Sequence, residues 1–407
     1  MKLLVLAILL TATQVSAAPA RAQVPNEIIR GTVNVVLANS HGIVVLTDSK
    51  GTIKNSAGQR PSAQDSQKLI RLDDRSVCAI AGFGSARVGS SLQFGVDVMG
   101  ILTNFRDQLS SKKSQLSFHE KLRTISFLLQ AELRGLANIE EVVAPQKIRD
   151  DKLTFSMFLV GYDSDGKPRI GTLILRAAPN VVIGGKTQWE ISDRVQLTEI
   201  GGDLQYDLAG MWDVGSDIFT RPQLHTQNPV GWKLWESAAD HGASLQINDL
   251  VEIAKFISAE THTKYPDQVG GQDQIAIFQD GGITKFEQQS FPTAPKPMQF
   301  LLLMDIPIVF AAGVGIQTPK GVPIIWIRCT IDGYVYLPID GNFYLGNEIR
   351  NSYVTYDGGP MFFDPSNKVV NSRIEIGFPI GSNEAIKRYL VQNFHWSECI
   401  PVGCENY

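Results

Sequence analysis

Two short apolar runs near the N-terminus set the first predicted structure. Residues 33–38 and 43–47 are rich in β-branched residues, and the turn formers at residues 39–42 separate them. This pattern predicts two strands joined by a tight turn. In such a hairpin, Thr32 before the first strand and Asp48 after the second reach the same end of the sheet. A hydroxyl and a carboxylate are therefore expected to be neighbours there.

Apolar residues farther along the chain change between helical and strand-like spacing. Spacing near 3.6 residues predicts helices over residues 118–137 and 247–261, and a further helical stretch is expected over residues 86–109. Runs of apolar and β-branched residues predict three further strands, over residues 154–162, 169–176 and 274–278. Helices packed against sheets in this order predict an α+β fold, a four-layer αββα sandwich.

The composition changes near residue 290, where residues 291–297 hold prolines at positions 292, 295 and 297. A proline-rich connector predicts a domain boundary, so we expect one domain over residues 32–289 and a second over residues 290–407. Apolar segments punctuated by Asp-Gly turns predict that the second domain is β-rich, with strands over residues 324–331, 334–337, 352–356 and 373–376. A short terminal helix is expected at residues 385–393.

The N-terminus has the features of a secretory signal peptide. Lys2 precedes an apolar run at residues 3–10, and small-residue cleavage sites follow it. We expect a signal peptide over residues 1–22 and a short propeptide over residues 23–31. The product is therefore expected to be secreted or periplasmic.

A cut between Gly31 and Thr32 would give the threonine a base of its own. A threonine hydroxyl is a weak nucleophile at neutral pH, but the cut would free an α-amino group with an ordinary pKa of about 7.7 to 8.0 beside it. Gly31 has no side chain that would crowd the carbonyl to be cut. Lys68 lies just before the predicted strand at Leu69-Ile70, and a cation near the hydroxyl and the amine would lower their pKa values.

In this order of residues the chain resembles the proteasome β-type subunits, in the threonine-nucleophile branch of the Ntn-hydrolase superfamily. The resemblance implies that Thr32 is the nucleophile, that Asp48 orients the site and that Lys68 is the lysine of the catalytic trio. It also implies that the backbone N–H of Gly82, in the segment AIAGFGSA, forms the oxyanion hole. The predicted fold is therefore an Ntn-hydrolase sandwich with an extra C-terminal domain.

The outer positions of the resemblance match less closely. Thr52 in the segment DSKGT resembles the substrate-contacting threonine, and Lys50 takes the place of the commoner arginine. Gly202 stands where the family has a Ser-Gly pair, and Asp267 lies one residue out of register with the later family motif. We expect Gly202 and Asp267 to support the site, with a weaker shell of hydrogen bonds around the trio.

The resemblance implies a threonine-type peptidase or amidohydrolase that processes itself at the Gly31-Thr32 bond. Its substrate would be a peptide or another amide, and hydrolysis would pass through an acyl-enzyme on Thr32 without a cofactor. The competing interpretation is a catalytically silent binding or scaffold protein in which the propeptide is never removed. A homo-oligomer is also expected, because subunits of this family stack through their helical faces.

Composition excludes some other functions. The 407 residues carry a formal net charge of −4, and no cluster of Lys and Arg suits phosphate binding, so we expect no nucleic-acid partner. The apolar run at residues 300–316 contains Asp305 and Pro307, which favours a buried strand pair over a membrane span. The six histidines are scattered, so we expect no metal. Cys399 and Cys404 could close a small disulfide ring.

Overall fold

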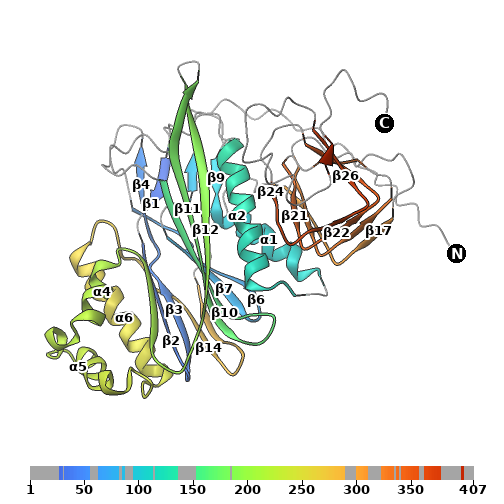
Figure 1. The fold of residues 1–407 in the computed structure, drawn as a ribbon. Helices are drawn as coiled ribbons and strands as arrows, with labels where there is room; N and C mark the ends of the chain where they lie inside the picture. The colour runs from blue at the N-terminus through green and yellow to red at the C-terminus, as the bar shows by residue number, and fades with distance from the viewer. Residues whose placement is uncertain are drawn as a thin grey trace.

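The computed structural model describes residues 27–30, 32–55, 63–81, 85–87, 95–112, 115–135, 153–183, 186–288, 299–309, 322–333, 336–338, 341–356, 362–376 and 396–397 of the chain. Within these residues the strands form six sheets, three of five strands and three of four (Figure 1). The same residues contain five α-helices, α1, α2, α4, α5 and α6. Strands therefore dominate the described part of the fold.

The predicted N-terminal hairpin is present. It consists of β2 (Val33–Asn39) and β3 (Gly42–Thr47), which pair antiparallel along their whole length. On its two sides lie β13 (Gln205–Gly210) and β14 (Gln274–Gln279), and β15 (Gly282–Glu287) completes the order β13-β2-β3-β14-β15. We call this sheet the hairpin sheet.

A second sheet, the long-strand sheet, has the order β12-β11-β10-β7-β6. Its members are β6 (Leu69–Asp73), β7 (Ser76–Ala81), β10 (Leu153–Tyr162), β11 (Pro168–Ile183) and β12 (Lys186–Glu199). Its buried residues pack with one face of the hairpin sheet, where Val36 of β2 and Val45 of β3 share a core cluster with Phe158 of β10. Because strand side chains alternate, Val35 and Leu37 of β2 lie in a different cluster, with the helices.

Helices pack against both of these sheets. The helices α1 (Val98–Ser110) and α2 (Phe118–Gly135) share a core cluster with the long-strand sheet. The helices α4 (Asp213–Thr220), α5 (Pro229–Glu236) and α6 (Ile247–Lys264) share one with the hairpin sheet. Two 3-10 turns, η1 (Pro222–His225) and η2 (Ser237–Asp240), connect α4 to α6 on either side of α5.

The predicted class, an α+β sandwich of four αββα layers, is wrong as a description of this fold. The predicted class requires two central sheets, but the described residues form six. Besides the hairpin sheet and the long-strand sheet there are four others. Part of the predicted helix 86–109 is also strand, because β8 (Ser85–Arg87) and β9 (Gly95–Asp97) occupy it. The helix α1 begins only at Val98, where the Asp97 side chain accepts a hydrogen bond from the Gly100 N–H at 3.1 Å.

The third five-stranded sheet contains the end of the predicted propeptide. Its order is β5-β4-β1-β8-β9, with β1 (Glu27–Arg30) in the middle and β4 (Lys50–Asn55) and β5 (Ala63–Asp65) on one side. The strand β1 pairs antiparallel with both β4 and β8. We call this sheet the N-terminal sheet. It places residues 27–30 in an extended conformation.

The C-terminal strands form a three-sided coil of parallel strands, and not the expected hairpins. Its sheets have the orders β16-β18-β21-β24, β17-β19-β22-β25 and β20-β23-β26-β27, and within the described residues their neighbouring strands pair parallel. The bounds of these strands are Leu301–Met304 (β16), Pro307–Val309 (β17), Ile324–Ile327 (β18), Thr330–Asp332 (β19), Tyr336–Pro338 (β20), Phe343–Leu345 (β21), Glu348–Arg350 (β22), Tyr353–Tyr356 (β23), Phe362–Phe363 (β24), Lys368–Val370 (β25), Arg373–Ile376 (β26) and Trp396–Ser397 (β27). Each turn of the coil adds one strand to each side.

Corners of the coil explain the difference from the predicted strands. The predicted strand 324–331 breaks at Arg328, whose φ is 51°, so that β18 and β19 lie on different sides. Stacked asparagines hold the corners, since the Asn347 side chain donates to the Trp326 carbonyl at 3.0 Å and to Asn367 Oδ1 at 2.9 Å. Residues 300–316 were expected to form a pair of strands. The structure has two strands there, β16 and β17, but they lie in different sheets and do not pair with each other.

The coil contacts α1 and α2, on the side of the molecule away from α4–α6 (Figure 1). Phe343 of the coil stacks on Phe127 of α2, with 5.3 Å between ring centroids. Arg328 links the same surfaces, because its guanidinium lies 2.9 Å from a carboxylate oxygen of Glu120 and 2.8 Å from one of Asp305. The boundary predicted at residues 289/290 lies outside the described residues and stays a prediction.

Several other predictions lie outside the described residues: the signal peptide 1–22, the helix 385–393 and the pair Cys399 and Cys404. Cys78 and Cys329 are described, and both are buried and free. In the part of the chain that the structure describes, no helix is long and apolar enough to cross a membrane.

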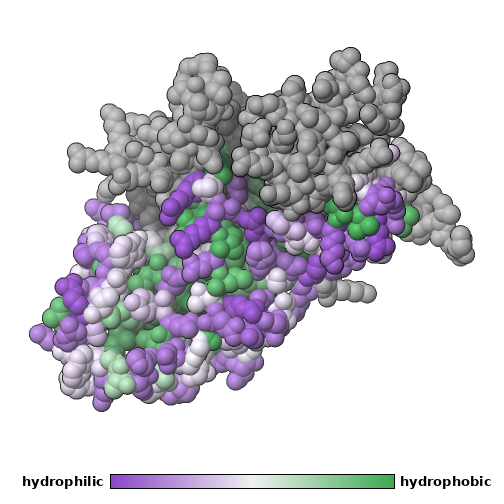
Figure 2. Space-filling model, in the orientation of Figure 1, coloured by the Kyte–Doolittle hydropathy of each residue, from purple (hydrophilic) through white to green (hydrophobic). Residues whose placement is uncertain are grey.

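Exposed aromatic side chains gather at the end of the molecule that carries α4–α6. Tyr206, Trp212, Trp232 and Trp235 are all at least 44% exposed there. Figure 2 shows hydrophobic and hydrophilic side chains side by side over this end. Such a patch is typical of a contact surface. The expected homo-oligomer stays a prediction.

An ion pair between a buried lysine and a half-buried aspartate joins α2 to the long-strand sheet. Lys121 is 4% exposed, and its Nζ lies 2.6 Å from Asp73 Oδ2 and 3.1 Å from Ser76 Oγ. Burial alone would raise the pKa of Asp73, but the charge and hydrogen bond of Lys121, with the N–H of Arg75 and the hydroxyl of Ser76, outweigh it and lower that pKa. The pair therefore stabilises the fold most when Asp73 is ionised.

We expect Asp73→Asn to lower the free energy of unfolding at pH 7 by about 1 kcal/mol, because the buried Lys121 loses its charged partner while the 35% exposure of the Asp73 side chain weakens the pair. A carboxyl whose pKa is lowered by folding stabilises fully above its unfolded pKa of about 3.9, and this stabilisation is lost as the pH falls through the folded value. Urea unfolding between pH 3 and pH 7 should therefore show wild type and variant converging at the acid end. Asp74→Asn, at an exposed neighbouring carboxylate, is the control and should change little. A difference that stays constant down to pH 3 would contradict the role of this pair.

Candidate active site

Thr32 lies directly before β2, with its side chain 2% exposed. By strand alternation it is on the same face of β2 as Val36, between the hairpin sheet and the long-strand sheet. Its Oγ1 donates to Asp48 Oδ1 at 2.7 Å and lies 3.2 Å from Thr47 Oγ1. The structure therefore brings together the hydroxyl and the carboxylate that the hairpin pattern predicts.

Asp48 is the centre of the hydrogen bonds at this end of the sheet. It is 1% exposed, and each of its two carboxylate oxygens accepts more than one hydrogen bond. The donors are Thr32 Oγ1, Val33 N and Lys68 Nζ on Oδ1, at 2.7, 2.9 and 2.8 Å, and Lys50 N and Gly270 N on Oδ2, at 3.2 and 3.1 Å. A buried carboxylate held in this way has one orientation, and its charge is compensated.

Lys68 supplies the positive charge. It is 5% exposed, and its Nζ also donates to the Lys50 carbonyl at 2.6 Å. Its backbone is fixed by Gln274 of β14, whose buried Oε1 accepts from the N–H groups of Lys68 and Leu69 at 3.2 and 3.1 Å. Sequence reasoning missed Gln274. Nothing in the local pattern marks it, because it lies more than two hundred residues from Lys68.

The loop after α6 completes the carboxylate site. Gly270, with φ of 144°, donates its N–H to Asp48 and accepts the Lys50 N–H at 2.9 Å through its carbonyl. The Lys50 side chain donates to the carbonyl of Pro266 in the same loop. Asp267, the predicted supporting residue, is exposed in this loop. The loop thus reaches the site through the backbone of Gly270.

The glycine that lies against Thr32 is Gly210, and not the predicted Gly202. Gly210 pairs with Val33 at the start of β2, and the next residue, Met211, donates its N–H to the Thr32 carbonyl at 2.9 Å. Gly202 lies beyond the opposite end of β13, which pairs with Ala38. At about 3.3 Å per residue, this is more than about 15 Å from Thr32. The register of β13 on β2, which no local sequence pattern reveals, places Gly210 at the site.

Three other predicted site residues are described in part or not at all. Gly31 and Gly82 lie outside the described residues. The backbone of Thr52 belongs to β4 and pairs with Arg30 of β1 in the N-terminal sheet. The oxyanion role of Gly82 and the substrate contact of Thr52 therefore stay predictions.

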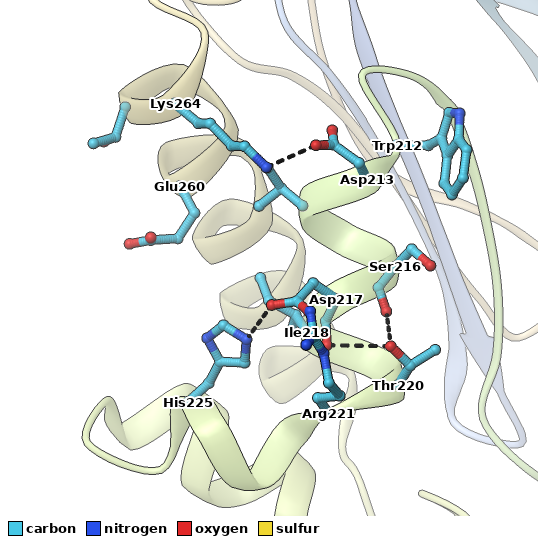
Figure 3. Close-up of a pocket in the computed structure, with 12 residues that line it drawn as sticks. Trp212, Asp213, Ser216, Asp217, Ile218, Thr220, Arg221, His225, Glu260 and Lys264 are labelled. Atoms are coloured by element: carbon cyan, nitrogen blue, oxygen red, sulfur yellow. Dashed lines mark hydrogen bonds and ion pairs between the residues drawn. The ribbon is translucent and has the colours of Figure 1, made fainter.

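A separate hollow of about 590 Å³ lies between α4, η1 and α6 (Figure 3). Two carboxylates in it are paired: Asp213 lies 2.7 Å from Lys264, and Asp217 lies 3.1 Å from the His225 ring. Trp212 at its edge is two residues from Gly210. Thr32, Asp48 and Lys68 do not line this hollow, so we take the buried trio as the candidate active site.

The trio can support nucleophilic chemistry but needs a further base. Asp48 already accepts five hydrogen bonds, three on one oxygen and two on the other, so it orients the Thr32 hydroxyl more readily than it takes its proton. Lys68 places a positive charge 2.8 Å from the Asp48 oxygen that also accepts from Thr32 Oγ1, so this charge is near the oxygen on which negative charge would develop. In the part of the chain that the structure describes, no group of three or more His, Cys, Asp or Glu side chains could hold a metal ion.

Comparison with known proteins leaves the family of this chain open. No protein-family model and no curated protein matches it. Among solved structures it resembles the helical assembly of the Anbu complex from Pseudomonas aeruginosa, at 12% identity and a TM-score of 0.38, over 65% of this chain and 88% of that one. Anbu (ancestral beta-subunit) from Yersinia bercovieri is similar at 12% identity and a TM-score of 0.36, over 63% and 86%.

These comparisons correct the predicted assignment to the proteasome β-type subunits of the Ntn-hydrolase superfamily. The two similar structures named above are Anbu proteins, and no family model supports the assignment. Likenesses this distant carry no argument about activity. The function must therefore be argued from the trio itself.

We expect Gly210→Ala to disrupt the site. A Cβ at Gly210 would lie 2.1 Å from the Thr32 carbonyl oxygen, so Thr32 or β13 must move. Gly281 is a matched control: its φ of 86° is close to the 83° of Gly210, but a Cβ there meets nothing within 4 Å. Urea unfolding should show a cost of about 1 kcal/mol for Gly281→Ala and about 3 kcal/mol for Gly210→Ala. Equal costs would mean that Gly210 does not pack against Thr32 in this way.

Proposed function

We propose that this protein hydrolyses amide bonds with Thr32 as its nucleophile, after its own chain has been cut between Gly31 and Thr32. The observation that carries the proposal is the buried trio, in which Thr32 Oγ1 lies 2.7 Å and Lys68 Nζ 2.8 Å from the same oxygen of Asp48. A positioned hydroxyl, an orienting carboxylate and a nearby cation are the parts that an activated nucleophile requires.

In the proposed reaction, Thr32 Oγ1 attacks the substrate carbonyl carbon and passes its proton to the free α-amino group of Thr32. That proton then goes to the leaving amine as the carbon–nitrogen bond breaks, which leaves an ester on Oγ1. Water hydrolyses the ester and regenerates the enzyme. Asp48 holds Oγ1 in place, and the charge of Lys68 stabilises the negative charge that develops there.

The position of β1 supports a peptide as the substrate. Ile29 lies opposite both Ile53 of β4 and Ser85 of β8, so the residues before Thr32 form the middle strand of the N-terminal sheet. Removal of residues 23–31 would leave the facing edges of β4 and β8 without a partner. An extended peptide could add there through backbone hydrogen bonds and bring its own carbonyl to Thr32.

The place of action is also part of the proposal. The signal-peptide features of residues 1–22 favour a secreted or periplasmic protein. The proline-rich segment at residues 291–297 favours a separate C-terminal domain, which would be the parallel coil.

We expect the chain beginning at Gln23 to convert itself, on incubation, to a product whose first residue is Thr32. Intact mass and N-terminal sequencing would follow the loss of residues 23–31. Thr32→Ala should abolish the conversion, and Thr32→Ser should retain it. Thr261→Ala is the matched control, because Thr261 is another fully buried threonine but its hydroxyl donates within α6, to the Ile257 carbonyl.

A wild-type chain that keeps residues 23–31 after prolonged incubation, and that hydrolyses no peptide amide, would overturn the proposal. The interpretation as a silent binding or scaffold protein would then replace it. Conversion that persists in Thr32→Ala would equally exclude Thr32 as the nucleophile.

A further inference from the structure

Asn34 has a buried side-chain amide whose N–H group lacks a hydrogen-bond partner in the described part of the chain. It lies two residues after Thr32 and is fully buried, and among the described residues its Nδ2 has no hydrogen-bond partner. Its Oδ1 lies 3.5 Å from Thr32 Oγ1. A buried N–H group without a partner destabilises a fold, so its presence at this position needs a reason.

Packing alone would favour an apolar residue at position 34. Thr32, Asn34, Val36 and Ala38 share one face of β2 by strand alternation, and Val36 and Ala38 belong to the dry core between the sheets. The strand neighbours of Asn34 are Thr47 on β3 and Ala209 on β13. A valine at position 34 would continue the apolar face without leaving a donor unpaired.

The partner that Asn34 can serve is the Thr32 oxygen. Thr32 Oγ1 has one proton, and it gives that proton to Asp48 at 2.7 Å, so the oxygen can accept from two donors. Thr47 Oγ1, 3.2 Å away, can supply one of them, which leaves a lone pair for a second. A half-turn of the Asn34 carboxamide about χ2 keeps its volume and exchanges Oδ1 for Nδ2. The unpaired N–H would then face Oγ1.

We propose that Asn34 is a further catalytic residue, whose side-chain N–H donates to Thr32 Oγ1 and stabilises the oxygen as it loses its proton. This inference rests on the proposed function, because it assigns Asn34 a role in that same reaction. A donor to the oxygen favours its deprotonated form and so lowers the pKa of the hydroxyl. The buried amide therefore lowers the stability of the fold and, in exchange, makes the Thr32 hydroxyl more reactive.

Two variants and one matched control test the inference. Asn34→Val removes the donor, and Asn34→Asp replaces the amide with a carboxylate of nearly the same shape. The control is Asn39→Val in the same strand: Asn39 is 4% exposed, but its Nδ2 donates to the carbonyls of Gly242 and Leu245 at 3.1 and 2.8 Å. Thermal unfolding, self-conversion and hydrolysis of a fluorogenic tripeptide amide would be measured on the full chain from Gln23. The hydrolysis rate would be expressed per free Thr32 N-terminus.

Asn34→Val should unfold at the same temperature as wild type or higher, and yet hydrolyse the amide about tenfold more slowly. The loss should appear as a lower plateau of the pH–rate profile, and the acid limb should stay in place because it reports the α-amino group that acts as the base. Asn34→Asp should be slower still, since it places a second carboxylate beside Asp48. Asn39→Val should show the opposite pattern, with a lower unfolding temperature and an unchanged pH–rate profile.

Each contrary result identifies what has failed. Wild-type rate and pH profile in Asn34→Val would overturn the role of Asn34 and leave the proposed function standing. A loss of stability in Asn34→Val as large as in Asn39→Val would also overturn it, because the amide would then have a structural partner. A wild-type chain that neither converts nor hydrolyses the probe would show that the proposed function fails, and the role of Asn34 with it.

Discussion

The buried pair of Asp48 and Lys68 is the interaction on which the rest of this structure depends. A carboxylate and an ammonium group that are at most 5% exposed lose most of their hydration, and they remain in the fold only because each finds a partner and further hydrogen bonds. Their hydrogen-bond partners come from the start of β2 in the hairpin sheet, from Lys50 at the start of β4 and from the loop after α6. One ion pair thereby aligns three separate parts of the chain, and Thr32 lies at their meeting point.

The local part of this site could be predicted from the sequence. Two β-branched runs around a tight turn require Thr32 and Asp48 to share one end of a hairpin, and a strand beginning at Leu69 carries Lys68 toward them. Gln274, Gly270 and Gly210 could not be found in that way. Their contribution depends on which strand lies beside which, and pairing between distant segments leaves no local pattern. Gly202 was wrong for the same reason, since the register of β13 on β2 places Gly210 at the site.

Many individual strands and helices could be predicted from the sequence, but the way in which they assemble into sheets could not. The predicted strands at residues 33–38, 274–278 and 373–376 are present, as are the helices that begin at Phe118 and Ile247. The αββα class failed because three sheets come from the parallel coil and one from the segments around β1. Asp-Gly pairs predict hairpins, but in the coil the chain turns at residues with positive φ, such as Arg328 and Asn351, and returns in the same direction. A positive φ is usually indicated by glycine, but Arg328 and Asn351 are not glycines, so the residue types do not reveal these corners.

The most direct test of the central claim is to trap the acyl group on the enzyme. The mature chain would be mixed with a blocked tripeptide nitrophenyl ester, quenched in acid within seconds, and the acylated residue located by fragmentation mass spectrometry. If Thr32 is the nucleophile that Asp48 and Lys68 position, the acyl group will be found on Thr32 and will be absent from Thr32→Ala. An acyl group on another residue, or none on a chain whose Thr32 amine is free, would contradict the account.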